Sequence, residues 1–202
     1  MPQHTDIDLD SVQTMAKVLG SLFYYPLTDA NNQALIRALS YASERGGSVF
    51  SDWSNTVNRE LPDTLEQDFF LLFEGGEILV APPWGSLYLE QSESPIGIST
   101  LKYRQFLRDY GIEVNTGVDD PEDQFGLMLF AVSQILELRY DVKVVKHLLG
   151  HFLLPWCYRY LELVERHALS KSYRELAYLT RQWCRVVQEV MSIEVKPSML
   201  YR

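Results

Sequence analysis

The chain has 202 residues, of which 47% are hydrophobic and 22% are charged, and its formal net charge is −9. This composition predicts a globular protein with one sizeable core, and we expect a single domain over residues 1–202. The negative charge disfavours binding to nucleic acid or to an anionic membrane, because both would repel the protein. A partner rich in arginine or lysine would be attracted.

The amino-terminal residues lack the basic and apolar regions of a secretory signal peptide, and no apolar run is long enough to span a membrane. The two cysteines, Cys157 and Cys184, lie far apart within helical patterns, which favours buried and reduced thiols. We therefore expect a cytoplasmic protein without stable membrane insertion.

Apolar residues recur every three or four positions along most of the chain, which predicts an all-α fold in the form of a helical bundle. Ser11 or Asp10 can cap a first helix, whose apolar face runs from Val12 to Phe23 and which Pro26 ends. A second helix has its apolar face from Leu35 to Ala42 and ends at the glycine pair at 46–47.

A third helix is expected to begin at Pro62, where Asp63 and Glu66 have the spacing of a capping box. Residues 75–98 then break the helical period, because glycine and proline recur through them. Only residues 87–89 resemble a short strand. We predict a long ordered loop here, and such a loop inside a compact domain is usually functional.

Ser99 is expected to cap a fourth helix that ends before Gly111, and Asp120 is expected to cap a fifth helix. Pro155 predicts a break between helices at 141–153 and 156–168. A last helix covers residues 173–190, followed by an extended tail from 193 to 202.

The segment from Glu60 to Leu101 carries eight carboxylates and no lysine, arginine or histidine. Within it, Pro82 and Pro83 hold Trp84 at a defined place. Acidic groups beside an aromatic face suit a basic peptide. Two other interpretations remain open: the acids serve only solubility, and Trp84 is a core residue that fastens the loop.

Enzyme signatures are missing: the sequence has neither a nucleophile elbow nor a common phosphate-binding loop. His147 and His151 share a helix face and could ligate a metal, but Leu148 replaces the glutamate of the usual zinc motif. Surface or interface histidines are the alternative. We therefore predict no catalytic residue, no metal and no cofactor.

The sequence around Trp84 resembles the TorD/DmsD family of redox-enzyme maturation chaperones. The resemblance rests on Leu72-Phe73, the glycine pair at 75–76, the run from Ala81 to Ser86, the run from Pro121 to Gly126, and Leu153-Leu154-Pro155-Trp156. The Pro-Pro-Trp-Gly-Ser motif is fairly specific, and the tail is most similar to the DmsD branch.

The resemblance implies a cytoplasmic chaperone and no enzyme. It would bind the twin-arginine leader of a molybdopterin oxidoreductase catalytic subunit and hold the subunit for cofactor loading before export by the Tat translocase, whose components are further expected partners. The matching positions for leader binding are Phe69, Leu72, Phe73, Pro83, Trp84, Asp123 and Gln124.

Gln124 stands where family members commonly have histidine, which puts a titratable switch at this position in doubt. Two alternatives stay open. The client body alone, without a leader, could be recognised, or the chain could be a weak guanine-nucleotide-binding protein, a property that has been linked to the resembled family.

Overall fold

The computed structural model describes residues 8–43, 49–75, 79–91, 94, 96–113 and 120–202. These residues form helices and include no β-strand, which confirms the all-α prediction. The chain divides into two compact units. The first unit contains residues 1–20, 84–157 and 183–202, and the second contains residues 21–83 and 158–182. The single-domain expectation stays a prediction.

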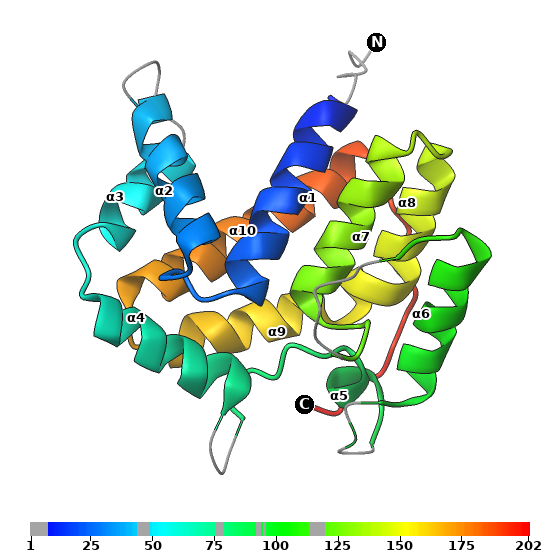
Figure 1. Ribbon diagram of the computed structural model, residues 1–202. Coiled ribbons are helices and arrows are strands. Elements are labelled where there is room, and N and C mark those ends of the chain that lie inside the picture. The colour runs from blue at the N-terminus through cyan, green and yellow to red at the C-terminus, as the bar shows by residue number, and fades with distance from the viewer. Residues whose placement is uncertain (1–7, 44–48, 76–78, 92–93, 95, 114–119) are drawn as a thin grey trace. The chain divides into compact units, whose positions relative to one another are not determined.

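Three helices have residues in both units: α1 (Leu9–Tyr24), α9 (Leu154–His167) and α10 (Lys171–Val190). The second unit also contains α2 (Ala30–Ser43), α3 (Val49–Val57) and α4 (Pro62–Phe69), which continues as a π-helical segment, Phe70–Glu74. Figure 1 shows α2 and α3 side by side, and they pack on each other.

Helix α3 was not predicted, although Phe50, Trp53 and Val57 have helical spacing and are all buried. The Trp53 indole donates a hydrogen bond to the carbonyl of Ser172 at 2.9 Å. This contact attaches α3 to the start of α10. The sequence signal was present but short, since α3 is only 9 residues long.

The first unit contains α5 (Ser86–Leu89), α6 (Ile98–Asp109), α7 (Phe125–Glu137), α8 (Val142–Leu148) and a second π-helical segment, Leu149–Leu153. Helices α5 and α6 pack together, as do α7 and α8. Helix α5 interrupts the predicted loop at 75–98, and the possible strand at 87–89 is therefore wrong. Positions 76–78, 92–93 and 95 of that loop lie outside the described residues.

Helix α4 begins at Pro62, as predicted, but the predicted capping groups are wrong. Helix α4 has Leu61 at its N-cap and no side-chain cap, so the capping box at Asp63 does not form. Helix α7 begins at Phe125 with Gln124 as its cap, not Asp120. Helix α6 begins after Gly97, so Ser99 lies inside its first turn. Gln124 lies further along the chain than Asp120, and Glu90, from an earlier segment, accepts hydrogen bonds from the first N–H groups of α6.

Pro155 does not break the chain into separate helices. The π-helical segment precedes it, and the proline occupies the second position of α9, where a missing N–H costs little. Helix α8, the π-helical segment and α9 therefore follow one another without an intervening loop.

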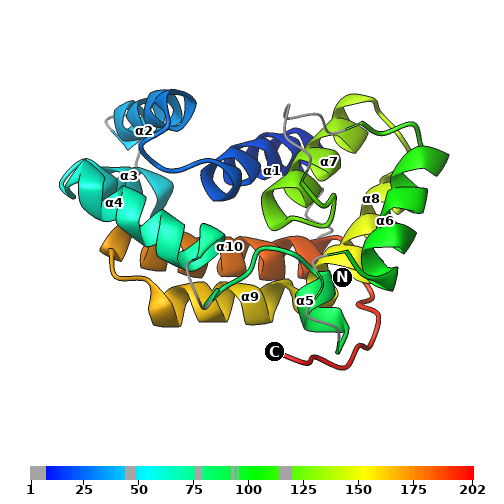
Figure 2. The ribbon, with the colours of Figure 1, turned by 60° about the horizontal axis from the view of Figure 1, so that its bottom comes forward.

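The carboxyl-terminal tail is extended and packs on the first unit, as predicted. The Lys196 N–H donates to the carbonyl of Gly150, and the Tyr201 N–H donates to the carbonyl of Tyr88, both at 2.9 Å. A Cβ atom at Gly150 would lie 2.4 Å from the carbonyl oxygen of Glu194, so only glycine admits the tail this closely. Figure 2 shows the tail running beside α5.

Candidate functional site

Two segments of the first unit, residues 84–86 and 123–124, contact each other directly after the two prolines. Trp84 forms an isolated antiparallel bridge with Gln124, and the Gly85 N–H donates to the carbonyl of Asp123 at 3.2 Å. The residues after the two prolines are thereby fixed against the residues that precede α7. The sequence resemblance placed Trp84, Asp123 and Gln124 in one site, and the structure brings these three together.

Asp123 is buried, with 4% of its surface exposed. Its Oδ2 accepts hydrogen bonds from the backbone N–H of Ser86 at 2.7 Å and from the hydroxyl of Thr100 at 3.1 Å. Its Oδ1 is also buried but accepts no hydrogen bond from any described residue. Burial outweighs these hydrogen bonds and raises the pKa of the carboxyl group from 3.8 to about 6.

Trp84 is half-buried, so part of its ring is accessible, while its indole nitrogen is buried. This Nε1–H donates no hydrogen bond within the described part of the chain. A buried donor without an acceptor is costly, and such groups call for an explanation. The site thus offers one unused donor on Trp84 and one unused acceptor on Asp123.

Trp156, not Trp84, is the core residue that fastens this region. It is 1% exposed, its indole donates to the carbonyl of Phe152 at 2.8 Å, and its ring stacks on Tyr88 with centroids 5.3 Å apart. A Cβ atom at Gly85 would lie 2.7 Å from the Trp156 Nε1, so the motif glycine is required by this packing. Trp84 itself is only half-buried, so the alternative that it is a core residue is wrong.

Gln124 has a structural task. Its side-chain oxygen accepts a hydrogen bond from the Leu127 N–H at 2.9 Å and so caps α7. The side chain is 5% exposed. A cap needs an acceptor and not a charge, which explains why glutamine serves here.

The other four predicted site residues, Phe69, Leu72, Phe73 and Pro83, lie in the second unit, and all are buried. The ring of Phe73 lies 5.2 Å from that of Phe69, 5.7 Å from Tyr173 and 6.2 Å from Tyr160, measured between centroids. Phe69, Phe73, Tyr160 and Tyr173 therefore form an aromatic cluster in the core of the second unit. Their side chains offer little surface to a peptide.

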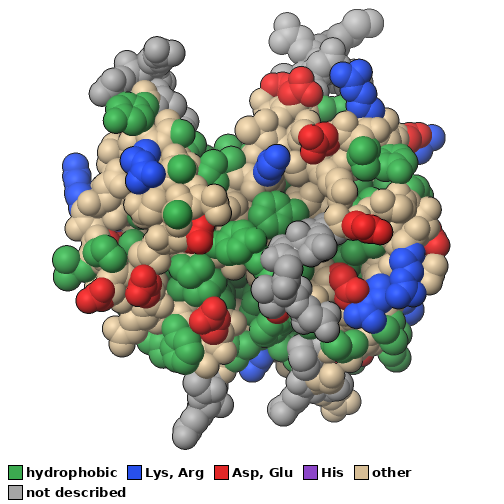
Figure 3. All heavy atoms as spheres, in the orientation of Figure 1, with side chains coloured by type: hydrophobic (Ala, Val, Ile, Leu, Met, Phe, Trp, Pro, Cys, Tyr) green, Lys and Arg blue, Asp and Glu red, His purple; other side chains and the backbone are tan. Residues whose placement is uncertain are grey.

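The neighbouring positions are exposed instead. Phe70 is 47% exposed and Leu71 is 39% exposed. Three exposed acids lie near them at helical spacing: Asp63, Glu66 and Glu74. We call these five residues the α4 stripe. Figure 3 shows acidic and hydrophobic side chains together over α4. Sequence analysis missed the two apolar members because each adjoins a residue of the predicted core face.

Several acids of the base-free segment cap helices. The carboxylate of Asp68 accepts from the N–H groups of Leu169 and Ser170, and that of Glu60 accepts from the N–H groups of Lys171 and Ser172. These four groups precede or begin α10. Asp68 and Glu60 therefore offset the positive end of a helix and contribute less to an external field.

Glu90 has the same role at α6. It accepts from the N–H of Ile98 at 3.0 Å and from the N–H of Ser99 at 2.6 Å. Burial opposes ionisation of Glu90, but these hydrogen bonds and the nearby Lys102 outweigh it and lower the pKa. Two further acids of the segment, Glu77 and Glu93, lie outside the described residues.

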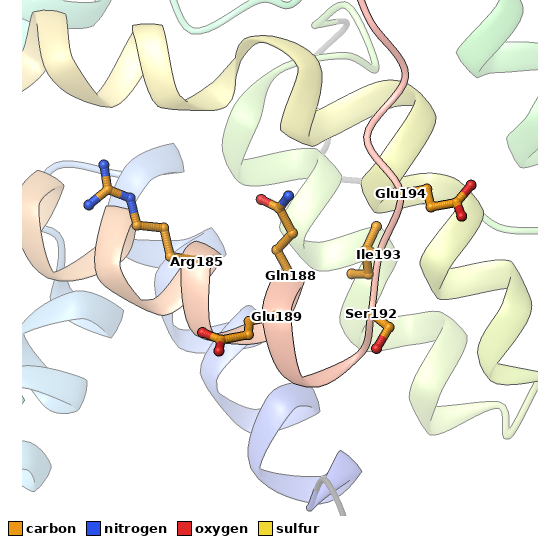
Figure 4. Close-up of a pocket in the computed structure, with 6 residues that line it drawn as sticks. All are labelled: Arg185, Gln188, Glu189, Ser192, Ile193 and Glu194. Atoms are coloured by element: carbon orange, nitrogen blue, oxygen red, sulfur yellow. The ribbon is translucent and has the colours of Figure 1, made fainter.

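Other candidate positions are less organised. His147 and His151 stack with ring centroids 4.2 Å apart, and the described residues contain no group of three metal-ligating side chains. A pocket of about 430 Å³ lies at the end of α10. In Figure 4 the side chains of Glu189 and Ser192 point away from that of Gln188. These side chains do not converge on a common ligand.

Cys157 and Cys184 are both buried free cysteines, as expected. Burial and the contact with Cys184 raise the pKa of the Cys157 thiol well above its ordinary value. None of the described helices combines the length and the apolar character needed to cross a membrane.

The chain is similar over most of its length to proteins of one family. The nitrate reductase delta subunit family matches residues 28–162. The Tat proofreading chaperone DmsD of Salmonella typhi is 30% identical, over 96% of this chain and 98% of the relative. The chaperone protein YcdY of Escherichia coli K12 is 28% identical, over 86% of this chain and 91% of that protein.

A solved structure has the same fold. It is the crystal structure of an Archaeoglobus fulgidus protein described as a redox enzyme maturation protein, with a TM-score of 0.59, 18% identity, and coverage of 90% of this chain and 96% of the other. The relatives cited above are named as chaperones and not as enzymes, in agreement with the prediction from sequence. The chain belongs to the TorD/DmsD family of redox-enzyme maturation chaperones.

Proposed function

We propose that this chain is a cytoplasmic chaperone for the catalytic subunit of a molybdopterin oxidoreductase. It binds the twin-arginine leader of that subunit and holds the subunit for cofactor loading before export through the Tat translocase. The names of the relatives support the chaperone role. The observation that supports peptide binding most is the pair of unused buried groups on Trp84 and Asp123.

An extended peptide carries backbone carbonyls that accept hydrogen bonds and N–H groups that donate them. A leader carbonyl can accept from the indole of Trp84, and a leader N–H or an arginine guanidinium can donate to Asp123 Oδ1. The exposed part of the Trp84 ring then offers a face for a guanidinium group. Because both Trp84 Nε1 and Asp123 Oδ1 are buried, both hydrogen bonds require a local opening of the site.

The second unit offers the α4 stripe, which we propose as a contact for the apolar part of the leader. Phe70 and Leu71 supply exposed apolar surface, and Asp63, Glu66 and Glu74 attract basic residues. The predicted residues Phe69, Leu72, Phe73 and Pro83 would act here by supporting the stripe from beneath, since they are buried. Each proposed contact lies within one unit and has its own test.

The function is tested by calorimetric titration with three synthetic leaders: one with paired arginines, one with paired lysines, and one of scrambled order. The arginine leader is expected to bind several-fold more tightly than the lysine leader, because guanidinium engages carboxylates and aromatic faces better. The variant Trp84→Phe should weaken binding, and Trp183→Phe, a change at another half-buried tryptophan, should not.

Equal affinity for the ordered and scrambled leaders would contradict the proposal. If the chaperone instead recognised the client body, deletion of the leader from the client would leave its capture from the cytosol unchanged. The proposal predicts that leader deletion abolishes or strongly reduces that capture.

A further inference from the structure

A second pocket, of about 390 Å³, lies in the first unit beneath the carboxyl-terminal tail. We call it the tail pocket. Its lining comes from the end of α5, the first turns of α6, the second π-helical segment and the tail, and it includes Lys102, His151, Phe152, Lys196, Met199 and Tyr201. Its volume lies at the lower end of the range for small-molecule sites.

The wall that the tail contributes is fixed at two points. The Lys196 N–H is bonded to the Gly150 carbonyl, and the Tyr201 N–H is bonded to the Tyr88 carbonyl. Residues 197–200 span the interval between these anchors. The tail pocket is therefore a built feature of the unit and not a chance gap beside a loose terminus.

Two lysines and one histidine line the tail pocket beside a single carboxylate, although the chain as a whole is acidic. Lys102, His151 and Lys196 come from three different segments and are exposed. Neither lysine has an ion pair within 4 Å among the described residues. The pocket's acid, Glu90, already accepts hydrogen bonds from the first turn of α6.

Apolar surface accompanies these basic groups. Phe152 is half-buried, Ile98 is 64% exposed and Met199 is 73% exposed. Tyr201, which is 51% exposed, adds a hydroxyl donor. The apolar body of an organic anion would cover this apolar surface, while its anionic group would accept hydrogen bonds from the lysine, histidine and tyrosine donors.

We infer that the tail pocket binds a small organic anion with an aromatic or aliphatic body. Phosphate and carboxylate share the required chemistry. A phosphate has more acceptor oxygens for donors that come from three segments, so the phosphate form binds more tightly. None of the residues that line this pocket belongs to the leader proposal, and the test of the pocket does not depend on that proposal.

The probes are phenyl phosphate, benzoate, phenol and inorganic phosphate, each titrated into the full chain while backbone amide signals are followed by NMR. Phenyl phosphate is expected to shift the amides of Ser99, Phe152 and Met199 saturably. Benzoate should bind more weakly, and phenol and inorganic phosphate should each bind about tenfold more weakly than phenyl phosphate.

Two double variants complete the experiment. Lys102→Ala with Lys196→Ala should weaken phenyl phosphate binding about tenfold. Lys17→Ala with Lys143→Ala removes two exposed lysines of the same unit outside the pocket and should leave binding unchanged. Absence of saturable shifts, equal weakening by both double variants, or inorganic phosphate binding as tightly as phenyl phosphate would each overturn the inference.

Discussion

Asp68 and Ser170 are 102 positions apart in sequence, yet the Asp68 Oδ2 accepts hydrogen bonds from both the backbone N–H and the hydroxyl of Ser170, at 2.9 and 2.5 Å. Asp68 is fully buried. The acid therefore stabilises the start of α10 from the end of α4. A carboxylate that seemed from sequence to belong to a cation-attracting surface is part of the internal structure of the second unit.

The first prediction concerns the stability that Asp68 provides. Asp68→Ala removes the acceptor of three hydrogen bonds and leaves buried donors unpaired, and it should lower the free energy of unfolding by about 3 kcal/mol. Urea denaturation measures this change. Glu66→Ala, at an exposed position of the same helix, should alter stability by less than about 0.5 kcal/mol. Similar losses in the two variants would show that the Asp68 contacts are not special.

Gly150 gives a second prediction, on the tail. A methyl group at this position would collide with the Glu194 carbonyl, so Gly150→Ala should displace the tail from the π-helical segment. Hydrogen exchange at the Lys196 amide, which is now bonded to the Gly150 carbonyl, should become faster. Unchanged protection of that amide would contradict the prediction, because it would mean that the tail stays bonded to the π-helical segment. The exchange rate of the Trp53 indole N–H, in the other unit, serves as the reference.

The third prediction is a pH dependence of stability that arises from Asp123. Its pKa is about 6 in the folded protein and 3.8 in its ordinary state. The folded state therefore binds the proton more tightly. The stability that this group contributes is fully present below pH 3.8 and is lost as the pH rises through 6.

Asp123→Asn removes this titration but retains an acceptor for Ser86. The stability of the wild type relative to the variant should fall by up to about 3 kcal/mol between pH 4 and pH 7.5. Urea denaturation of both proteins across this range measures it, with Asp63→Asn as the exposed control. If the free energies of unfolding of the wild type and Asp123→Asn differed by the same amount at every pH in this range, the raised pKa of Asp123 would be contradicted.

The α4 stripe provides a fourth prediction. Phe70→Ser with Leu71→Ser should weaken binding of the arginine leader about tenfold, because both side chains lose apolar surface that the leader would cover. Leu169→Ser removes a leucine that is 62% exposed in the same unit and should have no effect. Calorimetry compares the three proteins. If the double variant binds as well as the wild type, the apolar part of the leader lies elsewhere.

Helices with a long apolar repeat were predicted from the sequence, because the spacing of their apolar residues matches the buried face of a helix. Sequence analysis placed the start of α4 correctly at Pro62 but did not predict the groups that cap the helices. Carboxylates from other segments cap α6 and α10, and no local pattern reveals that Glu90 or Asp68 reaches a distant backbone. It also missed α3, whose apolar repeat is short.

The site was predicted in part. The motif residues Trp84, Asp123 and Gln124 do meet in the first unit, and the family resemblance was the source of that prediction. Exposure could not be obtained from the motif: Leu72 and Phe73 resemble a binding surface in sequence but form an aromatic core. Phe70 and Leu71 were overlooked because each adjoins a residue of the predicted core face, which is buried as expected.

The most direct measurement of the leader proposal is the NMR signal of the Trp84 indole N–H during titration with the arginine leader. The indole N–H groups of Trp53 and Trp156 already donate to carbonyls at 2.9 and 2.8 Å, so they serve as internal references. The Trp84 signal should shift downfield and saturate, and the dissociation constant obtained from this shift should equal the one measured by calorimetry. The signals of the two reference indoles should not move. A leader that binds without moving the Trp84 signal would contradict the account.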